Sequence, residues 1–470
     1  MTKVNTETSP KDEKLWCDLD EEQIIPENSL PIVFLGLMLA LFLAAMDQTI
    51  VAIALPRIIA QLHGFSGYSW VGTAYLLVTA TLSPLYGRLS DAVGRKPVLV
   101  GSIVMFLVGS ALCGAAQNLP WLILCRGLQG VGGGGIFPLV QIVMADITTL
   151  EERGKWAGAT GTTWSIAAVL GPVLGGILTD RLSWRWTFYI NLPLGALSCT
   201  IITLFLNTNP PPKKSFKSHL SSFDFLGLSC IFCSVSLLLL GFSFSESSWR
   251  SPATISCLCL GIASLGLTVF VELTTKRLPI IPPRLFMDRT PALLLLCSFL
   301  HAVVYYASAY YLPLYFQSLG ASATLAGIKG LAYSLTTGLF TTLGGLILPS
   351  LSDYRYILWF CWGVQIIGYG LMTQLSETSS ITKQEIYPFI AAMGTGGLFV
   401  PPLIALQGAM PVADLASSTS TYVLNRILGA TLGVSIGHTI FASRLVRFMA
   451  SLRRLESDVS SSILVKLDID

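Results

Sequence analysis

The chain has 470 residues, of which 53% are hydrophobic and 12% are charged, and its mean hydropathy is +0.67. Soluble domains carry about twice that charged fraction, so the composition excludes an ordinary soluble protein and indicates a helical protein that crosses a membrane several times. The formal net charge of +3 is close to neutral, so we expect no nucleic-acid partner.

Residues 1–30 are polar and acidic, and they contain no apolar core of the kind that a cleaved signal peptide has. We expect them to form a disordered tail in the cytosol. Thirteen apolar runs follow, each long enough to cross a bilayer as a helix. They lie near residues 31–56, 69–88, 97–117, 119–145, 155–179, 187–207, 223–244, 252–271, 291–317, 323–349, 355–375, 385–410 and 415–441.

Basic residues predict the orientation of these spans. With the N-terminus in the cytosol, the loops after even-numbered spans carry about thirteen Lys and Arg, and those after odd-numbered spans carry about five. Short basic loops stay on the cytosolic side, so we expect a multi-pass protein with a cytosolic N-terminus. Arginines clustered after the thirteenth span break this pattern, which either a missing last span or a basic helix on the membrane surface would explain.

Two residues of opposite charge lie deep in apolar spans, Asp47 in the first and Arg126 in the fourth. Counted from the predicted span ends, both lie roughly 10–14 Å below the outer surface of the membrane. Ionisable groups at that depth are costly and usually functional, so we expect the two to pair. Burial favours the neutral acid and a guanidinium favours the carboxylate, so a conformational change can switch the proton on and off. A static ion pair that fixes two helices is the alternative.

The second and third spans are joined by a short polar stretch over residues 87–97, which reads GRLSDAVGRKP. A link this short must be a tight hairpin, and its basic residues place it in the cytosol. The stretch closely resembles the loop-2/3 signature of the major facilitator superfamily, Gly-x-x-x-Asp-x-x-Gly-Arg-Lys, and the resemblance implies a loop that gates the cytosolic side. The matching residues are Gly87, Asp91, Gly94, Arg95 and Lys96.

Three further strings narrow the resemblance. Asp47 lies in MDQTIVAIALP, and Arg126 opens RGLQGVGGGG, whose glycines are not followed by the Lys of a phosphate-binding loop. Both strings are similar to motifs of the 14-span drug:proton antiporter family. The fifth span resembles a Gly-Pro-x-x-Gly-Gly element associated with antiport, although an ordinary helix kinked by its proline is the alternative. The residues of this antiport element are Gly171, Pro172, Gly175 and Gly176.

The second half of the chain matches the family more loosely. We expect the two halves to enclose a cavity with aromatic and small apolar walls, which suits hydrophobic or amphipathic organic molecules. Arg426 lies at about mid-membrane, and it either lines this path, pairs with helix carbonyls or has a structural role. The cavity residues that we expect are Gln48, Tyr75, Gln129, Trp164, Tyr306, Tyr310 and Arg426.

The resemblance implies an all-α membrane fold of two six-helix bundles with the substrate site at their interface. We place the first bundle at 31–207, a linker with two inserted spans at 208–290, and the second bundle at 291–445. The second bundle has about five spans, so its last helix is expected to be missing. Residues 446–470 are expected to form a basic and then polar tail.

The resemblance further implies an antiporter that exports small hydrophobic molecules, such as drugs, mycotoxins or other secondary metabolites, in exchange for protons that Asp47 and Arg126 couple. We expect a monomer in the plasma membrane, or alternatively in a vacuolar or vesicle membrane. The proton gradient is its energy source, and we expect no cofactor and no enzymatic activity. Cys230 and Cys233 have the spacing of metal ligands but no second ligand pair, so we expect no metal.

Two other functions stay open. The first is a proton-coupled importer of siderophores or other small solutes, against which the antiport element in the fifth span argues. The second is a non-transporting or decayed membrane protein, which the missing last span favours.

Overall fold

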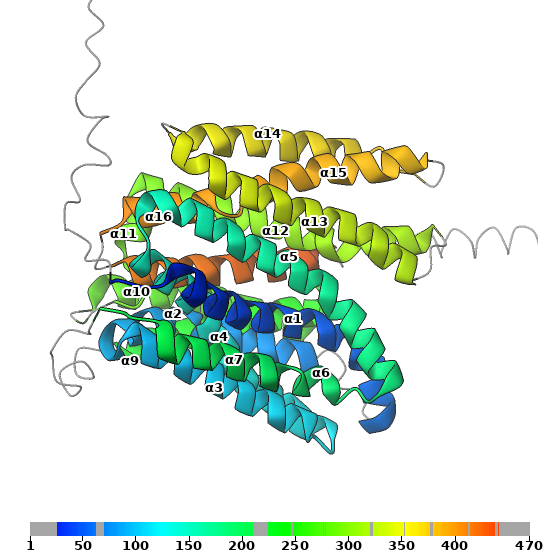
Figure 1. Cartoon of the computed structure of the whole chain (residues 1–470), viewed down its shortest axis with the longest axis horizontal. Coiled ribbons are helices and arrows are strands. Elements are labelled where there is room, and N and C mark those ends of the chain that lie inside the picture. The colour runs from blue at the N-terminus through cyan, green and yellow to red at the C-terminus, as the bar shows by residue number, and fades with distance from the viewer. Residues whose placement is uncertain are drawn as a thin grey trace, which may run out of the picture.

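The computed structural model describes residues 26–62, 70–209, 224–245, 248–275, 277, 279–319, 323–351, 353–376, 379–411, 414–437 and 440. The regular elements of this described part are helices (Figure 1). Nine of the helices in the described ranges are long and apolar enough to cross a bilayer. Of the tails expected at 1–30 and 446–470, residues 1–25 and 446–470 lie outside the described residues, as does the region where a fourteenth span would begin. Residues 26–30 are ordered, contrary to the expectation, because Asn28 donates to the carbonyl of Asn207 at 3.0 Å and α1 begins at Leu30.

The first half of the chain forms one group of helices, in the lower part of Figure 1. Its helices are α1 (Leu30–Leu62), α2 (Trp70–Val93), α3 (Arg95–Gly114), α4 (Leu119–Ile147), α5 (Leu150–Arg181), α6 (Trp186–Tyr189) and α7 (Asn191–Phe205). Two long helices follow, α9 (Phe225–Ser245) and α10 (Pro252–Thr274), which pack against each other, with α9 also against α2.

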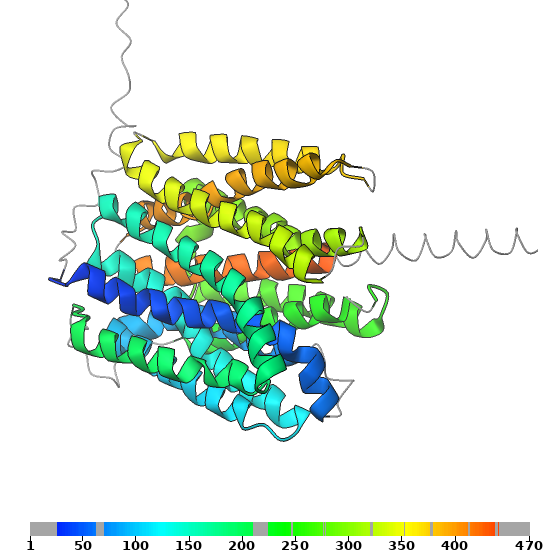
Figure 2. The same cartoon turned by 45° about the vertical axis from the view of Figure 1, so that its right-hand side comes forward.

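The second half lies above the first in Figure 1. It contains α11 (Arg284–Met287), α12 (Arg289–Ser318), α13 (Ala323–Ile347), α14 (Tyr354–Met372), α15 (Ile381–Gly397), α16 (Pro401–Ala409) and a last helix over residues 415–437. The helix α5 runs obliquely between the two halves and packs on both α1 and α13, as the two views in Figures 1 and 2 show.

Each of the thirteen predicted apolar runs is helical over its described residues, with differences in where the helices begin and end. The first run continues to Leu62 rather than ending near 56, so Asp47 lies at the middle of α1. The run at 187–207 is divided at Ile190 into α6 and α7, although Ile190 keeps helical dihedrals. The run at 385–410 is divided just before Pro401 and Pro402, because proline donates no backbone hydrogen bond and disfavours helical geometry in the residue before it.

The link between α2 and α3 is shorter than the polar stretch at 87–97 suggested. The helix α2 continues through Asp91 to Val93, and α3 begins at Arg95, so Gly94 alone separates them. Gly94 has φ 108° and ψ 150°, a conformation that L side chains rarely adopt. The predicted tight hairpin is therefore confirmed, and its turn depends on one glycine. Below, the end of the molecule that carries Arg88, Arg95 and Lys96 is called the basic end.

Gly94→Ala should lower the stability of the folded protein by about 1–2 kcal/mol, because a Cβ at positive φ is strained. Gly101→Ala is the matched control, since a Cβ at Gly101 of α3 meets no atom within 4 Å and alanine favours the helix. Thermal unfolding of the purified proteins in detergent gives the comparison. Equal melting temperatures for the two variants would contradict the assignment of the turn to Gly94.

Candidate functional site

A fully buried carboxylate, that of Asp47, lies at the centre of the first half of the molecule. Its Oδ2 accepts a hydrogen bond from Nη1 of Arg126, 2.5 Å away. Its Oδ1 accepts from Nε2 of Gln129 at 2.8 Å and from Nδ2 of Asn191 at 3.3 Å. The predicted pairing of Asp47 with Arg126 is therefore confirmed, and α1, α4 and α7 meet at this carboxylate.

A second layer of hydrogen bonds holds the donors in place. Arg126 Nη1 also donates to Gln129 Oε1 at 2.7 Å, and Arg126 Nε donates to the carbonyl of Val71 at 3.1 Å. Ser110 Oγ of α3 accepts from both amides, from Gln129 Nε2 at 2.7 Å and from Asn191 Nδ2 at 2.8 Å. Buried charges are tolerated when they are paired and fully hydrogen-bonded, and this arrangement meets that condition for the carboxylate.

Aromatic rings shield the guanidinium of Arg126, which is 2% exposed. Its Cζ lies 4.4 Å from the ring centroid of Tyr75 and 5.9 Å from that of Phe188. Such stacking is favourable when the cation is out of water.

We call Asp47, Ser110, Arg126, Gln129 and Asn191 the buried network. Asn191 and Ser110 were not predicted as site residues, and polar side chains in otherwise apolar runs were the one signal for them.

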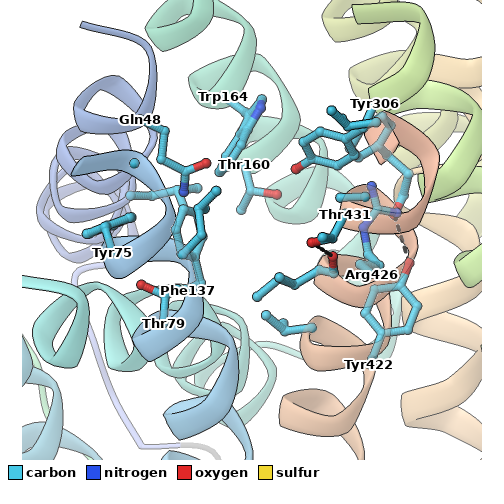
Figure 3. A pocket seen from close by; sticks show the side chains of 18 of the residues that line it. Gln48, Tyr75, Thr79, Phe137, Thr160, Trp164, Tyr306, Tyr422, Arg426 and Thr431 are labelled. Carbon is cyan, nitrogen blue, oxygen red and sulfur yellow. Dashed lines mark hydrogen bonds between the residues drawn. The ribbon is translucent and has the colours of Figure 1, made fainter. Parts of the chain in front are cut away.

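A cavity of about 490 Å³ lies beside the buried network, between the two halves of the chain (Figure 3). Residues from both halves line it, and Figure 3 shows those of α1, α2 and α4 facing those of α12 and the 415–437 helix. Gln129 differs from the prediction, because the structure places it in the buried network and not in the cavity wall. The predicted cavity residues that do line it are Gln48, Tyr75, Trp164, Tyr306, Tyr310 and Arg426.

Two residues belong to both the cavity wall and the surroundings of Asp47. Arg126 lines the cavity while it holds the carboxylate, and Tyr75 lines the cavity while its ring covers the guanidinium. Asp47 itself is 0% exposed. A molecule in the cavity would therefore contact the partner of the carboxylate rather than the carboxylate.

The cavity also extends toward the end opposite the basic end, where Leu55, Gly72 and Val434 line it.

The antiport element of α5 packs against α1 one turn beyond Asp47. A Cβ on Gly171 would collide with Oγ1 of Thr49, and one on Gly175 would lie 2.8 Å from the carbonyl oxygen of Ile50. A Cβ on Gly176 would meet no atom within 4 Å. The helix α5 is continuous through residue 172. Glycines at 171 and 175 thus permit close contact between two helix backbones beside the buried network.

The other end of α5 packs against α13 of the second half. A Cβ on Gly158 would lie 3.0 Å from Cα of Thr342, and one on Gly345 would collide with the carbonyl of Gly154. Thr342 also hydrogen-bonds Thr162. The helix α5 therefore touches the helix of Asp47 along one part and the second half of the molecule along another.

The residues predicted to gate the cytosolic side lie together at the basic end, and Asp91, Arg95 and Lys96 make contacts within the first half. Arg95 donates to Asp91 Oδ1 at 2.6 Å and to Asp146 Oδ2 at 2.7 Å, and Lys96 donates to the carbonyl of Leu206 at 2.9 Å. These bonds join α2, α3, α4 and the end of α7 within the first half. Asp91 thus pairs with Arg95, a base of the same stretch.

Gly87 and Arg88 contribute to the contacts between the halves at the basic end. A Cβ on Gly87 would lie 2.8 Å from the carbonyl oxygen of Ala416, so the backbones of α2 and the 415–437 helix are in close contact. Arg88 Nη2 lies 3.6 Å from Asp414 Oδ1, and Arg88 Nε donates to the carbonyl of Pro279 at 2.9 Å. The role of Asp414 was not predicted, because the sequence does not show which helix faces Arg88.

The chain matches the family model described as Major Facilitator Superfamily over residues 37–434. A Schizosaccharomyces pombe protein named Uncharacterized MFS-type transporter C1399.02 is 42% identical, over 91% of this chain and 73% of that protein. Efflux pump dotC of Dothistroma septosporum is 36% identical over 92% of this chain and 74% of the pump. The crystal structure of the human organic anion transporter MFSD10 superposes with a TM-score of 0.65 at 16% identity, over 88% of this chain and 94% of that one, which shows a common fold.

The energetic coupling within the buried pair is testable by a double-mutant cycle. Arg126→Met alone should destabilise the protein by about 3–5 kcal/mol, because it leaves Asp47 buried without a counter-charge. The double variant that also carries Asp47→Asn should lose much less stability than the sum of the losses in the two single variants. Thermal unfolding in detergent measures these losses. The partly exposed pair Asp353 and Arg355, whose Oδ2 and Nε lie 3.0 Å apart, is the control and should give nearly additive changes. Additive costs at the buried pair would contradict the strong coupling.

Proposed function

The chain belongs to the major facilitator superfamily, and from that membership we propose that it is a proton-coupled efflux transporter of small hydrophobic organic molecules. The observation that carries the proposal is the buried network, which holds a protonatable carboxylate in contact with a residue of the cavity wall. The name of the relative dotC, an efflux pump, supports export as the direction of transport.

Asp47 is the residue proposed to bind the transported proton. As a carboxylate it accepts three hydrogen bonds, from Arg126, Gln129 and Asn191. Protonation removes its negative charge and weakens the hydrogen bond from the guanidinium, because that bond is charge-assisted. The two protonation states therefore favour different positions of Arg126, and with it of the cavity wall.

The proposed route from Asp47 to the second half runs through α5. Thr49, two residues after Asp47, donates to the carbonyl of Ala167 in α5 at 3.3 Å and faces Gly171. A shift of α1 is thus transmitted to α5 and, through the contact of Gly158 with Thr342, to α13. Transporters of this fold alternate access by rocking one helical bundle against the other around a central site.

The described conformation supports assignment to one state of the transport cycle. The halves are in contact at the basic end through Gly87 and Arg88, and the cavity extends toward the opposite end. If the basic end faces the cytosol, as the distribution of Lys and Arg predicts, this is the outward-facing state. In that state Asp47 would take up a proton as substrate leaves, and in the inward-facing state it would lose the proton as substrate binds.

We further propose a monomer in the plasma membrane with its N-terminus in the cytosol.

Asp47→Asn should abolish proton-driven export, because asparagine cannot carry the proton, while the protein still folds. We expect a fall of at least about tenfold in the initial rate of dye or drug extrusion driven by a pH gradient in proteoliposomes. Asp180→Asn, at an exposed position of α5, is the control and should keep the wild-type rate. Cells that hold Asp47→Asn at full surface expression and still keep drug out as well as wild type would refute the proposal.

Close contact between α5 and α1 should be needed for transport. Gly171→Ala places a methyl group against Thr49 and should reduce the export rate several-fold more than Gly176→Ala, whose methyl group meets open space. Both variants should reach the membrane in similar amounts. Rates compared at equal amounts of folded protein test this, and equal export by the two variants would remove the contact from the mechanism.

A further inference from the structure

The charged residues in the cavity wall are both arginines. Among the described lining residues, Arg126 and Arg426 are the ones with a formal charge, and no Asp or Glu is present. The charge of Arg126 is balanced by Asp47, 2.5 Å away. Arg426 is therefore the charge that the cavity offers to a bound molecule.

Arg426 is held in place by a neutral partner. Its Nη1 lies 3.2 Å from Nδ1 of His301, and Nε2 of the same ring lies 2.9 Å from the carbonyl oxygen of Thr395. The carbonyl needs a donor, so Nε2 carries the hydrogen and Nδ1 accepts from the arginine. His301 is 0% exposed and belongs to α12, so the guanidinium is fixed against the second half of the molecule.

No described carboxylate lies within 4.0 Å of the Arg426 guanidinium. Its Cζ lies 4.4 Å from the ring centroid of Phe399 and 5.9 Å from that of Tyr422, and both rings line the cavity. A guanidinium has five N–H donors, of which the bonds to His301 and to the hydroxyl of Tyr422 use two. An arginine at membrane depth with no counter-ion among the described residues is costly, so we take Arg426 as a functional group.

The rest of the wall suits flat aromatic molecules with oxygen acceptors. Tyr306 and Thr431 lie on the same side as Arg426 in Figure 3, and Trp164 and Phe137 lie across the cavity from them. The aromatic rings offer apolar surface for stacking, and the hydroxyls and the guanidinium offer donors at fixed positions.

We propose that the cavity selects aromatic molecules that carry a carbonyl, enolate or carboxylate oxygen, which accepts hydrogen bonds from Arg426, and that it rejects lipophilic cations. Arg426 would repel a lipophilic cation, which would find no counter-ion among the described residues of the cavity wall. This inference rests on the proposed function, because it assumes that the cavity is the substrate site.

Two fluorescent dyes that share a xanthene skeleton test the inference, anionic fluorescein and cationic rhodamine 6G. Binding to the purified protein in detergent, followed by fluorescence anisotropy, should favour fluorescein over rhodamine 6G by at least about tenfold, the range that a hydrogen bond to a charged group supplies. Arg426→Gln should weaken fluorescein binding by a similar factor. Arg426→Glu should reverse the preference. Arg355→Glu, an equal change of charge on a 58% exposed side chain, should leave both affinities unchanged.

Preference of the wild type for rhodamine 6G, absence of binding of either dye, or unchanged fluorescein binding in Arg426→Gln would overturn the inference. Thermal unfolding of each variant shows whether it is folded. These outcomes are separate from a failure of the proposed function, because binding is measured without a proton gradient. Proton-independent transport with the predicted dye preference would refute proton coupling and leave this inference standing.

Discussion

The ion pair of Asp47 and Arg126 is the constraint on which the first half of the structure depends. A buried carboxylate is tolerated if its oxygens are paired and hydrogen-bonded, and here the donors come from α4 and α7, with Ser110 of α3 and the Val71 carbonyl of α2 fixing them. Moving α1 or α4 alone would separate the two charges, and moving α2, α3 or α7 alone would remove one of the hydrogen bonds that hold them. The helices of the first half are therefore expected to move together as one rigid body.

Small residues mark the surfaces where this body meets the second half. Glycines at 154, 158 and 345 bring α5 and α13 into backbone contact, and Gly87 does the same for α2 and the 415–437 helix. Such interfaces have little interlocking of large side chains, so they permit tilting more readily than the packed interior of either half does. The cavity lies on the same boundary, and each half contributes one arginine to its wall. A tilt of one half against the other would change the distance between the two sides of the cavity.

Much of the fold follows from the sequence, and part of the site does not. Apolar runs predict the helices because a bilayer requires about twenty such residues, and two opposite charges at similar depth predict the pair. The run alone does not say which way a helix is rotated, so Gln129 was expected in the cavity and lies in the buried network. For the same reason Asn191, Ser110 and Asp414 were missed, since each acts through a partner on another helix. The sequence shows the glycine at the turn, Gly94, but it does not show that α2 continues to Val93 and that α3 begins at Arg95.

The central claim is that substrate binding and proton binding at Asp47 exclude each other, and proton release on binding measures this most directly. Purified protein in weakly buffered detergent is mixed with a saturating dye or drug at a series of pH values, and we expect the release of up to about one proton per bound molecule. The pH indicator should report no release from Asp47→Asn, although that variant still binds. Binding without proton release in the wild type at every pH, or equal release from Asp47→Asn, would contradict the account.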